Sequence, residues 1–229
     1  MYTHDMKSMA IHKIVIFIQF LVLLGCTNPG DQQSADTSAN HDESSGESLF
    51  DGKTFQGWEG DTVNFFRIEE GAIVGGNLEK DIPHNAFLCT NRTYDNFVLT
   101  LQFKLLGQHT NAGVQFRSVR IPNHHEMIGY QADLGEGYWG CLYDESRRRE
   151  VLTGPDSATI AQALKPDDWN TYEIRAEDKQ IQLFINGTQT VDYTEPLDSI
   201  PQTGLIGLQI HSGGPGEVWY KDITISELP

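Results

Sequence analysis

The 229-residue chain lacks the sequence features that mark several common classes of protein. Only 3 cysteines are present, and none is spaced with histidine in the manner of a zinc site. There is no Gly-x-Ser-x-Gly nucleophile turn and no phosphate-binding loop. Basic residues are scarce as well, because 16 Lys and Arg stand against 32 Asp and Glu, for a formal net charge of −16. Nucleic acids and anionic lipid surfaces are therefore poor partners, whereas binding of a neutral sugar is unaffected.

Long hydrophobic runs are absent except near the N-terminus. Residues 14–24 are apolar apart from one glutamine, and Lys7 and Lys13 precede them. A transmembrane helix needs about 20 apolar residues, so this run is too short to span a bilayer. It is typical of a secretory signal, and we predict a signal peptide over residues 1–25.

The predicted signal peptide is followed by a cysteine in a suggestive context. Leu23-Leu24-Gly25-Cys26 looks like a bacterial lipobox, in which Cys26 is lipidated and begins the mature chain; an incidental cysteine after an ordinary signal is the alternative. Residues 26–47 are rich in Ser, Asp, Gln and Gly and cannot bury enough apolar surface to become ordered. We expect a bacterial envelope lipoprotein, facing the periplasm or the cell surface. Only its lipid would contact the membrane, and a disordered tether would precede one domain at residues 48–229.

Strand signals dominate this domain. From Phe97 to Leu105 apolar and polar residues alternate without a break, as in a strand with one face on a core. Asn186-Gly187 predicts a two-residue hairpin turn, and residues 157–164 are the one helix candidate. Many short strands separated by Gly, Pro, Asn and Asp predict an all-β, antiparallel β-sandwich with a concave ligand face.

Three of the expected strands carry strongly polar side chains on one face. Residues 114–117, 130–133 and 208–211 contribute the pairs Gln115 with Arg117, Gln131 with Asp133, and Gln209 with His211. Alternate residues of a strand share a face, and the opposite faces here are apolar or small. The pattern fits either three solvated surfaces or one polar groove of neighbouring strands that recognises a hydroxyl-rich ligand. We favour the groove, because solvated strand faces more often show Thr, Ser, Lys or Glu.

Further candidates lie between residues 138 and 150. Tyr138 and Trp139 follow a glycine-rich stretch and could stack on sugar rings, although a tryptophan that fills the core is the alternative. Glu145 would share a strand face with Tyr143. Arg148 belongs to three consecutive arginines flanked by acids, which form either a solvated turn with surface ion pairs or a cationic site for a carboxylate or enolate oxygen.

Metal binding and disulfide formation receive little support from the sequence. His124-His125-Glu126 could ligate a metal, but adjacent residues of an extended chain point apart, so an exposed loop is the preferred interpretation. Cys89 and Cys141 could pair in an oxidising compartment, but spacing alone does not show it, and we prefer two buried thiols. No metal or cofactor is predicted, although a structural calcium is compatible with this fold.

Eight motifs are each weak alone but specific in their order. They are Leu49-Phe50-Asp51-Gly52-Lys53 with Gly57-Trp58, Asn111-Ala112-Gly113-Val114-Gln115-Phe116-Arg117-Ser118, Gly129-Tyr130-Gln131 with Asp133, Leu142-Tyr143-Asp144-Glu145, Trp169-Asn170, Asn186-Gly187, Ile206-Gly207-Leu208-Gln209-Ile210-His211 and the final Val218 to Leu228. Together they resemble the 3-keto-disaccharide hydrolase domain family over residues 49–228.

The resemblance implies a jelly-roll sandwich similar to the concanavalin A-like lectins and glucanases. It also implies cleavage of glycosides oxidised to a ketone at carbon 3, by a 3-keto-glucoside 1,2-lyase coupled to a 3-keto-2-hydroxyglucal hydratase. Laminarinase-type glucanases on this fold use a Glu-x-Asp-x-Glu strand, which neither Asp133-Leu134-Gly135-Glu136 nor Asp144-Glu145 supplies. This departure argues against ordinary retaining hydrolysis, which needs two carboxylates flanking the bond.

Elimination from a 3-keto-glycoside needs a base for the proton on carbon 2, donors for the enolate oxygen and an acid for the leaving group. The hypothesis makes His211 the base or proton shuttle, with a structural hydrogen-bonding histidine as the alternative. Arg117 with Gln115 would stabilise the enolate, and Asp133 or Glu145 would act as acid and second base. The remaining candidates for binding the oxidised sugar are Gln131, Tyr143, Gln209, Arg148 and Trp139.

Two other functions compete with this one. A non-catalytic carbohydrate-binding lipoprotein could use the same groove, but three proton-transfer groups would be redundant in it. A plain structural lipoprotein would explain the tether but not the groove. The enzyme is the preferred hypothesis.

Overall fold

The computed structural model describes residues 46–229. The predicted signal peptide, Cys26 and most of the tether lie outside these residues. Strand β1 (Glu47–Ser48) pairs with the end of the chain through Glu47 and Ile225. Ordered pairing therefore begins one residue earlier than the predicted domain boundary at Ser48.

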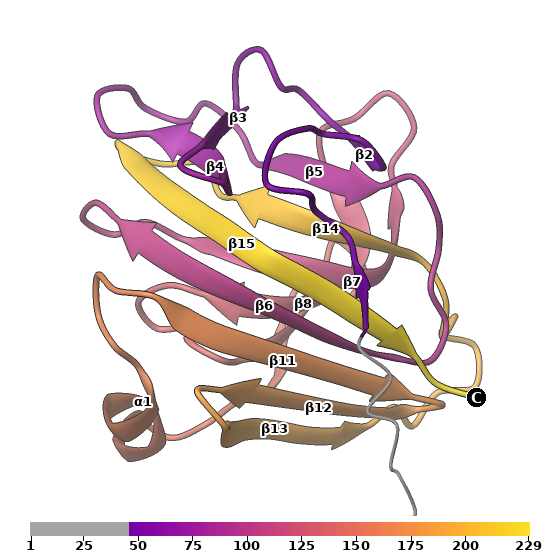
Figure 1. The fold of residues 1–229 in the computed structure, drawn as a ribbon. Coiled ribbons are helices and arrows are strands. Elements are labelled where there is room, and N and C mark those ends of the chain that lie inside the picture. Colours follow the sequence, from indigo (N-terminus) through magenta and orange to yellow (C-terminus); the bar gives the residue numbers. More distant parts are fainter. Residues whose placement is uncertain (1–45) are drawn as a thin grey trace, which may run out of the picture. The chain divides into compact units, whose positions relative to one another are not determined.

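Fifteen strands form two antiparallel sheets that pack face to face (Figure 1). The eight-stranded sheet has the order β13 (Thr188–Thr194), β12 (Gln180–Ile185), β11 (Asn170–Glu177), β6 (Phe97–Leu106), β15 (Gly216–Glu227), β4 (Ala72–Asn77) and β3 (Phe66–Glu69), with β1 beside β15. The seven-stranded sheet has the order β10 (Val151–Thr153), β9 (Leu142–Glu145), β8 (Met127–Leu134), β7 (Ala112–Arg120), β14 (Leu205–Ile210), β5 (Ala86–Thr90) and β2 (Trp58–Glu59). The predicted all-β, antiparallel sandwich is confirmed.

The core lies between the two sheets. Along β6 every second residue from Phe97 to Leu105 is buried while its neighbours are half-buried, as the sequence alternation predicted. Two tyrosines of the eight-stranded sheet cross the core to the other sheet. The hydroxyl of Tyr220 lies 3.0 Å from the carbonyl oxygen of Gly113 and 2.9 Å from that of Gln209, and the hydroxyl of Tyr172 lies 3.5 Å from the carbonyl oxygen of Asp133. These contacts fix the backbones of the strands that carry the polar residues.

The local turn and helix predictions are also confirmed. Asn186 and Gly187 connect β12 to β13 with positive φ angles of 50° and 79°, the conformation that an Asn-Gly hairpin turn requires. Helix α1 (Ser157–Ala163) begins at Asp156, whose carboxylate accepts a 2.7 Å hydrogen bond from the backbone amide of Thr159. Within residues 46–229, no helix is long and apolar enough to cross a membrane.

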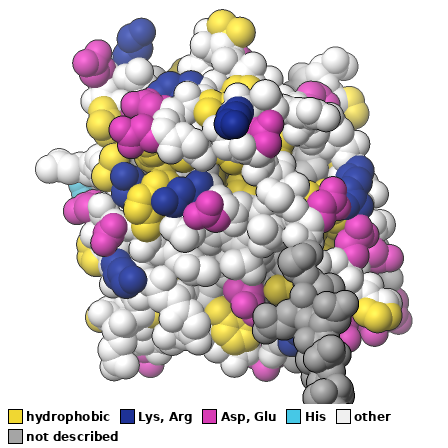
Figure 2. Space-filling view, in the orientation of Figure 1, with side chains coloured by type: hydrophobic (Ala, Val, Ile, Leu, Met, Phe, Trp, Pro, Cys, Tyr) yellow, Lys and Arg dark blue, Asp and Glu magenta, His cyan; other side chains and the backbone are white. Residues whose placement is uncertain are grey.

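The outer surface of the eight-stranded sheet carries scattered charge. Figure 2 shows acidic and basic side chains interspersed over this face, without a large area of either sign. Lys104 lies between two indole rings, 5.0 Å from Trp169 and 4.8 Å from Trp219. A mixed surface of this kind is typical of a solvated face.

The three polar strands are neighbours, in the order β8, β7, β14. Tyr130, Ala132 and Leu134 of β8 belong to the core, so Gln131 and Asp133 project from the outer face. The two thiols on this sheet are free, with Cys89 buried and Cys141 half-buried, and Cys89 donates to the sulfur of Met127 at 3.3 Å. A single polar surface on adjacent strands is the arrangement that the groove hypothesis predicted.

Candidate active site

A cavity of about 460 Å³ opens on the outer face of the seven-stranded sheet. It is lined by His109, Asn111, Gln131, Asp133, Glu136, Tyr138, Tyr143, Glu145, His211 and Ser212. Five of the residues proposed from the sequence meet here, namely Gln131, Asp133, Tyr143, Glu145 and His211. They come from β8, from β9 and from the end of β14, and alternation on these strands brings them to one face.

Asp133 is the most buried carboxyl group of the cavity, with 4% of its surface exposed. Burial disfavours its ionised form and raises the pKa of Asp133 to about 8, although hydrogen bonds from the backbone of Leu134 and from the side chains of Gln131 and Asn111 oppose this rise. At neutral pH the group is therefore mostly protonated. A protonated carboxyl can donate a hydrogen bond or a proton to a ligand.

Glu145 is the second carboxyl group of the cavity. Burial raises the pKa of Glu145, the negative charge of Glu126 raises it further, and His211 lowers it. Tyr143, two residues earlier on the same strand face, also lines the cavity, and its ring meets that of Tyr138 edge-on at 6.5 Å. Burial, followed by the charge of Glu145, raises the pKa of Tyr143. Both shifts extend the pH range over which these side chains carry their protons.

His211 lies immediately after β14, at the rim of the polar strands. Its backbone amide donates to the carbonyl oxygen of Asn111 at 3.0 Å, and its Nδ1 lies 2.7 Å from the carbonyl oxygen of Ser212. A carbonyl oxygen only accepts hydrogen bonds, so Nδ1 carries the proton in the neutral ring. The lone pair of the neutral imidazole is then on Nε2, where it can accept a proton.

Glutamines form the floor between the catalytic candidates. Gln115 donates from Nε2 to Oε1 of Gln131 at 2.8 Å, so it supports a lining residue without lining the cavity itself. The side chain of Gln131 lies over Gly113, where an added Cβ would come within 2.7 Å of it. Gln209, opposite Gly113 on β14, is fully buried, and both polar atoms of its amide lack a partner among the described residues. Gln209 is therefore the one buried amide of this face that remains unsatisfied.

The placement of Arg117 corrects the sequence hypothesis. A break in the β7–β8 register after Phe116 gives Arg117 a positive φ of 47°, so the strict alternation that put it beside Gln115 does not hold. Its guanidinium is engaged by the carbonyl oxygens of Asp95 and Asp178 and by the side chains of Asn96 and Gln202, at 2.5 to 3.0 Å. Arg117 joins loops at the opposite end of the strand and cannot hold an enolate oxygen in the cavity.

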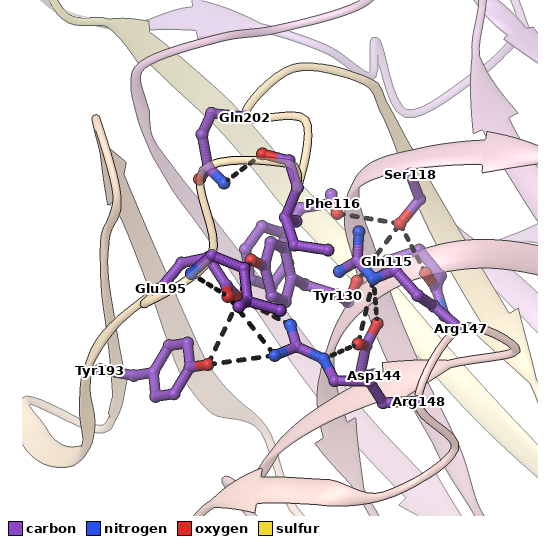
Figure 3. A network of polar contacts seen from close by, with 12 residues as sticks. Gln115, Phe116, Ser118, Tyr130, Asp144, Arg147, Arg148, Tyr193, Glu195 and Gln202 are labelled. Atoms are coloured by element: carbon purple, nitrogen blue, oxygen red, sulfur yellow. Dashed lines mark hydrogen bonds and ion pairs between the residues drawn. The ribbon is translucent and has the colours of Figure 1, made fainter.

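Arg148 also lies outside the cavity, which corrects its proposed role in binding. Its guanidinium contacts Asp144 and donates to Glu195 at 2.6 Å, while Arg147 donates to Asp144 at 2.9 Å. Figure 3 shows Arg148 between the two carboxylates, with the hydroxyl groups of Tyr130 and Tyr193 on Glu195. This inner ionic network points away from Glu145, because Asp144 and Glu145 are successive strand residues. The alternative of a solvated turn holds only for Arg149 and Glu150, which are exposed, because the ion pairs of Arg147 and Arg148 are made with the buried Asp144.

Trp139 lies beside the cavity instead of lining it. Its ring stacks on Phe103 at 6.3 Å, and it borders a smaller cavity of about 160 Å³. His109 and Glu136, which form an exposed 3.1 Å pair, line both cavities and separate them. Trp139 is half-buried against the core, as the core-filling alternative predicted, and its stacking on a sugar ring stays a prediction.

Sequence reasoning missed several lining residues. Asn111 stood in a motif and Glu136 in the stretch compared with the glucanase strand, but neither received a role, and Tyr138 was considered only for stacking on a sugar ring. Asn111 could have been found from its place just before a polar strand. No sequence pattern pointed to His109, because it lies in a loop, and the position of a loop side chain depends on the folded backbone.

The described residues offer no ready metal centre. Across residues 46–229, no group of three or more His, Cys, Asp or Glu side chains converges as a metal-binding set. His124 and His125 stack on each other at 4.3 Å, and His125 lies 3.4 Å from Glu126. Stacked rings do not direct their nitrogens toward a common point. The compatibility with a structural calcium stays a prediction.

Comparison with known families identifies the family of the domain. Residues 45–226 match the family described as the 3-keto-alpha-glucoside-1,2-lyase-like domain. The chain belongs to this family. The resemblance drawn from the eight motifs is thereby confirmed, and membership of the 3-keto-alpha-glucoside-1,2-lyase-like family gives the domain a carbohydrate-related function. No curated protein matches the chain in sequence.

Solved structures share the fold of this family member at low sequence identity. A Parabacteroides distasonis protein provisionally described as a glycosyl hydrolase is 20% identical, with a TM-score of 0.59, over 79% of this chain and 93% of its own. A Bacillus subtilis protein of unknown function with a galectin-like fold is 12% identical, with a TM-score of 0.59, over 76% and 90%. The Bacillus subtilis carbohydrate-binding module CBM66 is 11% identical, with a TM-score of 0.56, over 75% and 96%. These similarities confirm the jelly-roll sandwich.

Proposed function

We propose that the domain cleaves glycosides that are already oxidised to a ketone at carbon 3. The reaction removes the proton from carbon 2, expels the aglycone from carbon 1 and then adds water to the resulting enone. The observation that carries the proposal is the gathering of three proton-transfer groups, Asp133, Glu145 and His211, in one cavity on a polar strand face. The family match supports the same class of substrate.

His211 acts as the base in this proposal. The ketone acidifies the proton on carbon 2, and Nε2 of the neutral ring takes that proton as the carbon–hydrogen bond breaks. The electron pair moves onto the carbon 3 oxygen and forms an enolate. Because Nδ1 is held by the carbonyl oxygen of Ser212, the ring cannot present the wrong nitrogen without losing that hydrogen bond.

Asp133 takes the role that the sequence hypothesis gave to Arg117. An enolate oxygen is stabilised by nearby hydrogen-bond donors in a site with little water. The buried Asp133, with a pKa raised to about 8, supplies a donor hydrogen at neutral pH, and the amides of Asn111 and Gln131 line the same wall. Neutral donors suit a buried enolate without the cost of burying a guanidinium.

Glu145 completes the proton balance. As the enolate collapses to the enone, the bond between carbon 1 and the leaving oxygen breaks, and that oxygen takes the proton of Glu145. The resulting carboxylate then removes a proton from water, whose oxygen adds to carbon 1. The proton on His211 exchanges with solvent while the enone is bound, and His211 then delivers a solvent-derived proton to carbon 2. All three groups end in their starting protonation states, and the net change is hydrolysis of the glycosidic bond.

The N-terminal sequence supports a cellular location for this reaction. We propose that Cys26 is lipidated and that the domain faces the periplasm or the cell surface of a bacterium on a short tether. Expression with radiolabelled palmitate should label the wild-type chain and not a Cys26→Ser variant. Equal labelling of the two would remove the lipobox interpretation.

Proton NMR in deuterium oxide tests the reaction. Purified residues 46–229 are mixed with a 3-keto-glucoside or with 3-keto-trehalose, and in parallel with the unoxidised sugars. Cleavage of the keto sugars alone, with deuterium appearing at carbon 2, is the expected result. Cleavage of the unoxidised sugars without deuterium at carbon 2 would indicate ordinary hydrolysis instead.

A carbohydrate-binding module is the second candidate. It is favoured by the similarity to CBM66 and by Tyr138, which is 42% exposed at the mouth of the cavity and could stack on a sugar ring. In the same NMR samples, this function predicts shifted sugar signals with no turnover of either substrate.

A further inference from the structure

Asn85 lies behind the cavity and joins three segments of the chain. It comes immediately before β5, is 7% exposed and is absent from the cavity lining. Its Nδ2 donates to Oε1 of Glu126 at 3.0 Å, and its Oδ1 accepts from the backbone amide of Ser212 at 2.9 Å. One asparagine thus connects the start of β5, the residue before β8 and the segment that follows β14.

The two partners fix which way the Asn85 amide points. A carboxylate only accepts hydrogen bonds and a backbone amide only donates them, so Nδ2 must face Glu126 and Oδ1 must face Ser212. The flipped amide would lose both hydrogen bonds in a buried place, where unsatisfied polar groups are strongly disfavoured. The orientation of Asn85 is therefore determined by its surroundings.

Ser212 is held by Asn85 through its backbone amide, and it holds His211 through its carbonyl group, which is the next polar group along the backbone. The carbonyl oxygen of Ser212 lies 2.7 Å from Nδ1 of His211. The following residue, Gly213, exchanges two backbone hydrogen bonds of 2.9 Å with Ile82, so this segment is anchored on both sides of the carbonyl group. A hydrogen-bonded path runs from Glu126 through Asn85 and Ser212 to the imidazole ring.

We propose that Asn85, with Glu126 behind it, is a positioning residue that holds His211 in the tautomer with the proton on Nδ1 and the free lone pair on Nε2. The catalytic meaning of this tautomer rests on the function proposed above, whereas the tautomer itself does not. Without Asn85 the Ser212 peptide loses its side-chain anchor and the ring can exchange tautomers or rotate. A base displaced by about 1 Å from its substrate can lose on the order of 100-fold in rate.

Nitrogen NMR of the imidazole tests the tautomer directly. Histidine is labelled with 15N in the wild type, and a His211→Gln variant identifies the His211 signals. Above neutral pH, the wild type is expected to show a protonated Nδ1 and an unprotonated Nε2. A wild-type His211 with its proton on Nε2 would overturn the proposal before any Asn85 variant is made.

Variants of Asn85 then test its part in this arrangement. Asn85→Ala should mix the two tautomers and lower kcat for a 3-keto-glucoside roughly 10- to 100-fold, with KM nearly unchanged. Asn85→Asp keeps an oxygen that accepts from Ser212, so it should retain the tautomer and recover part of kcat. Asn85→Ala with the wild-type tautomer and kcat would contradict the proposal.

Asn170→Ala is the matched control. Asn170 is also buried, and its side chain bonds the backbone of Lys165 and Asp168, away from His211. It should lose stability like Asn85→Ala yet leave the His211 signals unchanged; the same tautomer shift in both would reduce the effect to general loosening. If the wild type turns over no keto sugar while Asn85→Ala still shifts the tautomer, the proposed function is wrong and the positioning by Asn85 stands.

Discussion

Strands β8 and β9 carry acidic side chains on both faces, and the two sets differ in their partners. On the inner face Asp144 of β9 meets Glu195, which follows β13, and the two carboxylates are surrounded by Arg147, Arg148 and the hydroxyl of Tyr130. On the outer face Asp133 and Glu145 form no ion pair with any Lys or Arg of residues 46–229. Asp133 is buried like Asp144 and Glu195, so its partners, and not its burial, distinguish the cluster fit for proton transfer from the structural cluster.

The pKa values express this difference. Burial also works against ionisation of Glu195, but hydrogen bonds from Arg148 and Tyr130 outweigh it and lower the pKa of Glu195 to about 2. At Asp133 nothing of comparable strength opposes burial, and the pKa is raised to about 8. The inner carboxylate is held ionised and joins the two sheets, whereas the outer carboxyl is held protonated and faces an open cavity. The partner of a buried acid, more than its burial, therefore indicates its use.

Removing the outer acid should have the largest effect on chemistry. Asp133→Asn replaces the acidic donor with a far less acidic amide, which stabilises the developing charge on the enolate oxygen less well, so we expect turnover of a 3-keto-glucoside to fall roughly 100- to 1,000-fold. The fold should persist, and thermal unfolding at pH 8 should move to a higher temperature, because a buried carboxyl no longer has to ionise. Full activity in this variant would mean that Asp133 is only a structural residue of the sheet.

Removing the inner acid should have the largest effect on stability. Asp144→Asn leaves Arg147 and Arg148 without their carboxylate, and breaking a buried ion pair costs about 3–5 kcal/mol of unfolding free energy. Turnover at low temperature should stay within a few-fold of wild type, because Asp144 does not line the cavity. Urea unfolding and initial rates on the same sample check both statements. A loss of turnover without a loss of stability would reverse the roles assigned to the two faces.

The two faces should also respond to pH in opposite directions. Asp133 has a folded-state pKa of about 8, above its unfolded value of 3.8, so its contribution to stability is present at low pH and is lost as the pH rises between these values. Glu195 has a folded-state pKa of about 2, below the model-compound value of 4.5, so its contribution is present above that value and is lost as the pH falls. Urea unfolding from pH 2 to 9 measures both.

Variants separate the two contributions to this pH profile. Asp133→Asn should reduce the decrease in unfolding free energy at alkaline pH and leave the acid side unchanged. Glu195→Gln should reduce the decrease at acid pH and leave the alkaline side unchanged. A profile that neither variant changes would show that other groups control the pH dependence.

Gln209 belongs to neither set of acids, and its substitution should change activity and stability the least. Its buried amide has no partner, so Gln209→Met should stabilise the free protein by about 1–3 kcal/mol. If the amide binds a sugar hydroxyl once the floor rearranges, the same variant should raise KM with little change in kcat. Gln115→Met is the control, because it breaks the hydrogen bond to Gln131 and should destabilise. A destabilised Gln209→Met would show that the amide has a partner in solution.

The fold and part of the site were predictable from residue patterns. Period-two alternation in Phe97 to Leu105 and the Asn186-Gly187 turn depend on local geometry, which is the same in any sheet. Gln131 with Asp133, and Tyr143 with Glu145, reached one cavity because regular strands keep alternate residues on one face. Arg117 departed from the pattern at a strand irregularity, where φ becomes positive and alternation stops.

By itself, then, the sequence determined the sandwich, the family and the strand face on which the polar residues lie. Those features depend on periodicity and short motifs, which can be identified in the amino-acid sequence alone. Only the tertiary structure decided which acid has a cation beside it. Arg148 reaches Glu195, 47 residues away, and Asn85 reaches Ser212, 127 residues away. Contacts across such separations exist only after the sheets have packed, so the protonation states that distinguish a structural carboxylate from a chemically useful one are properties of the folded molecule.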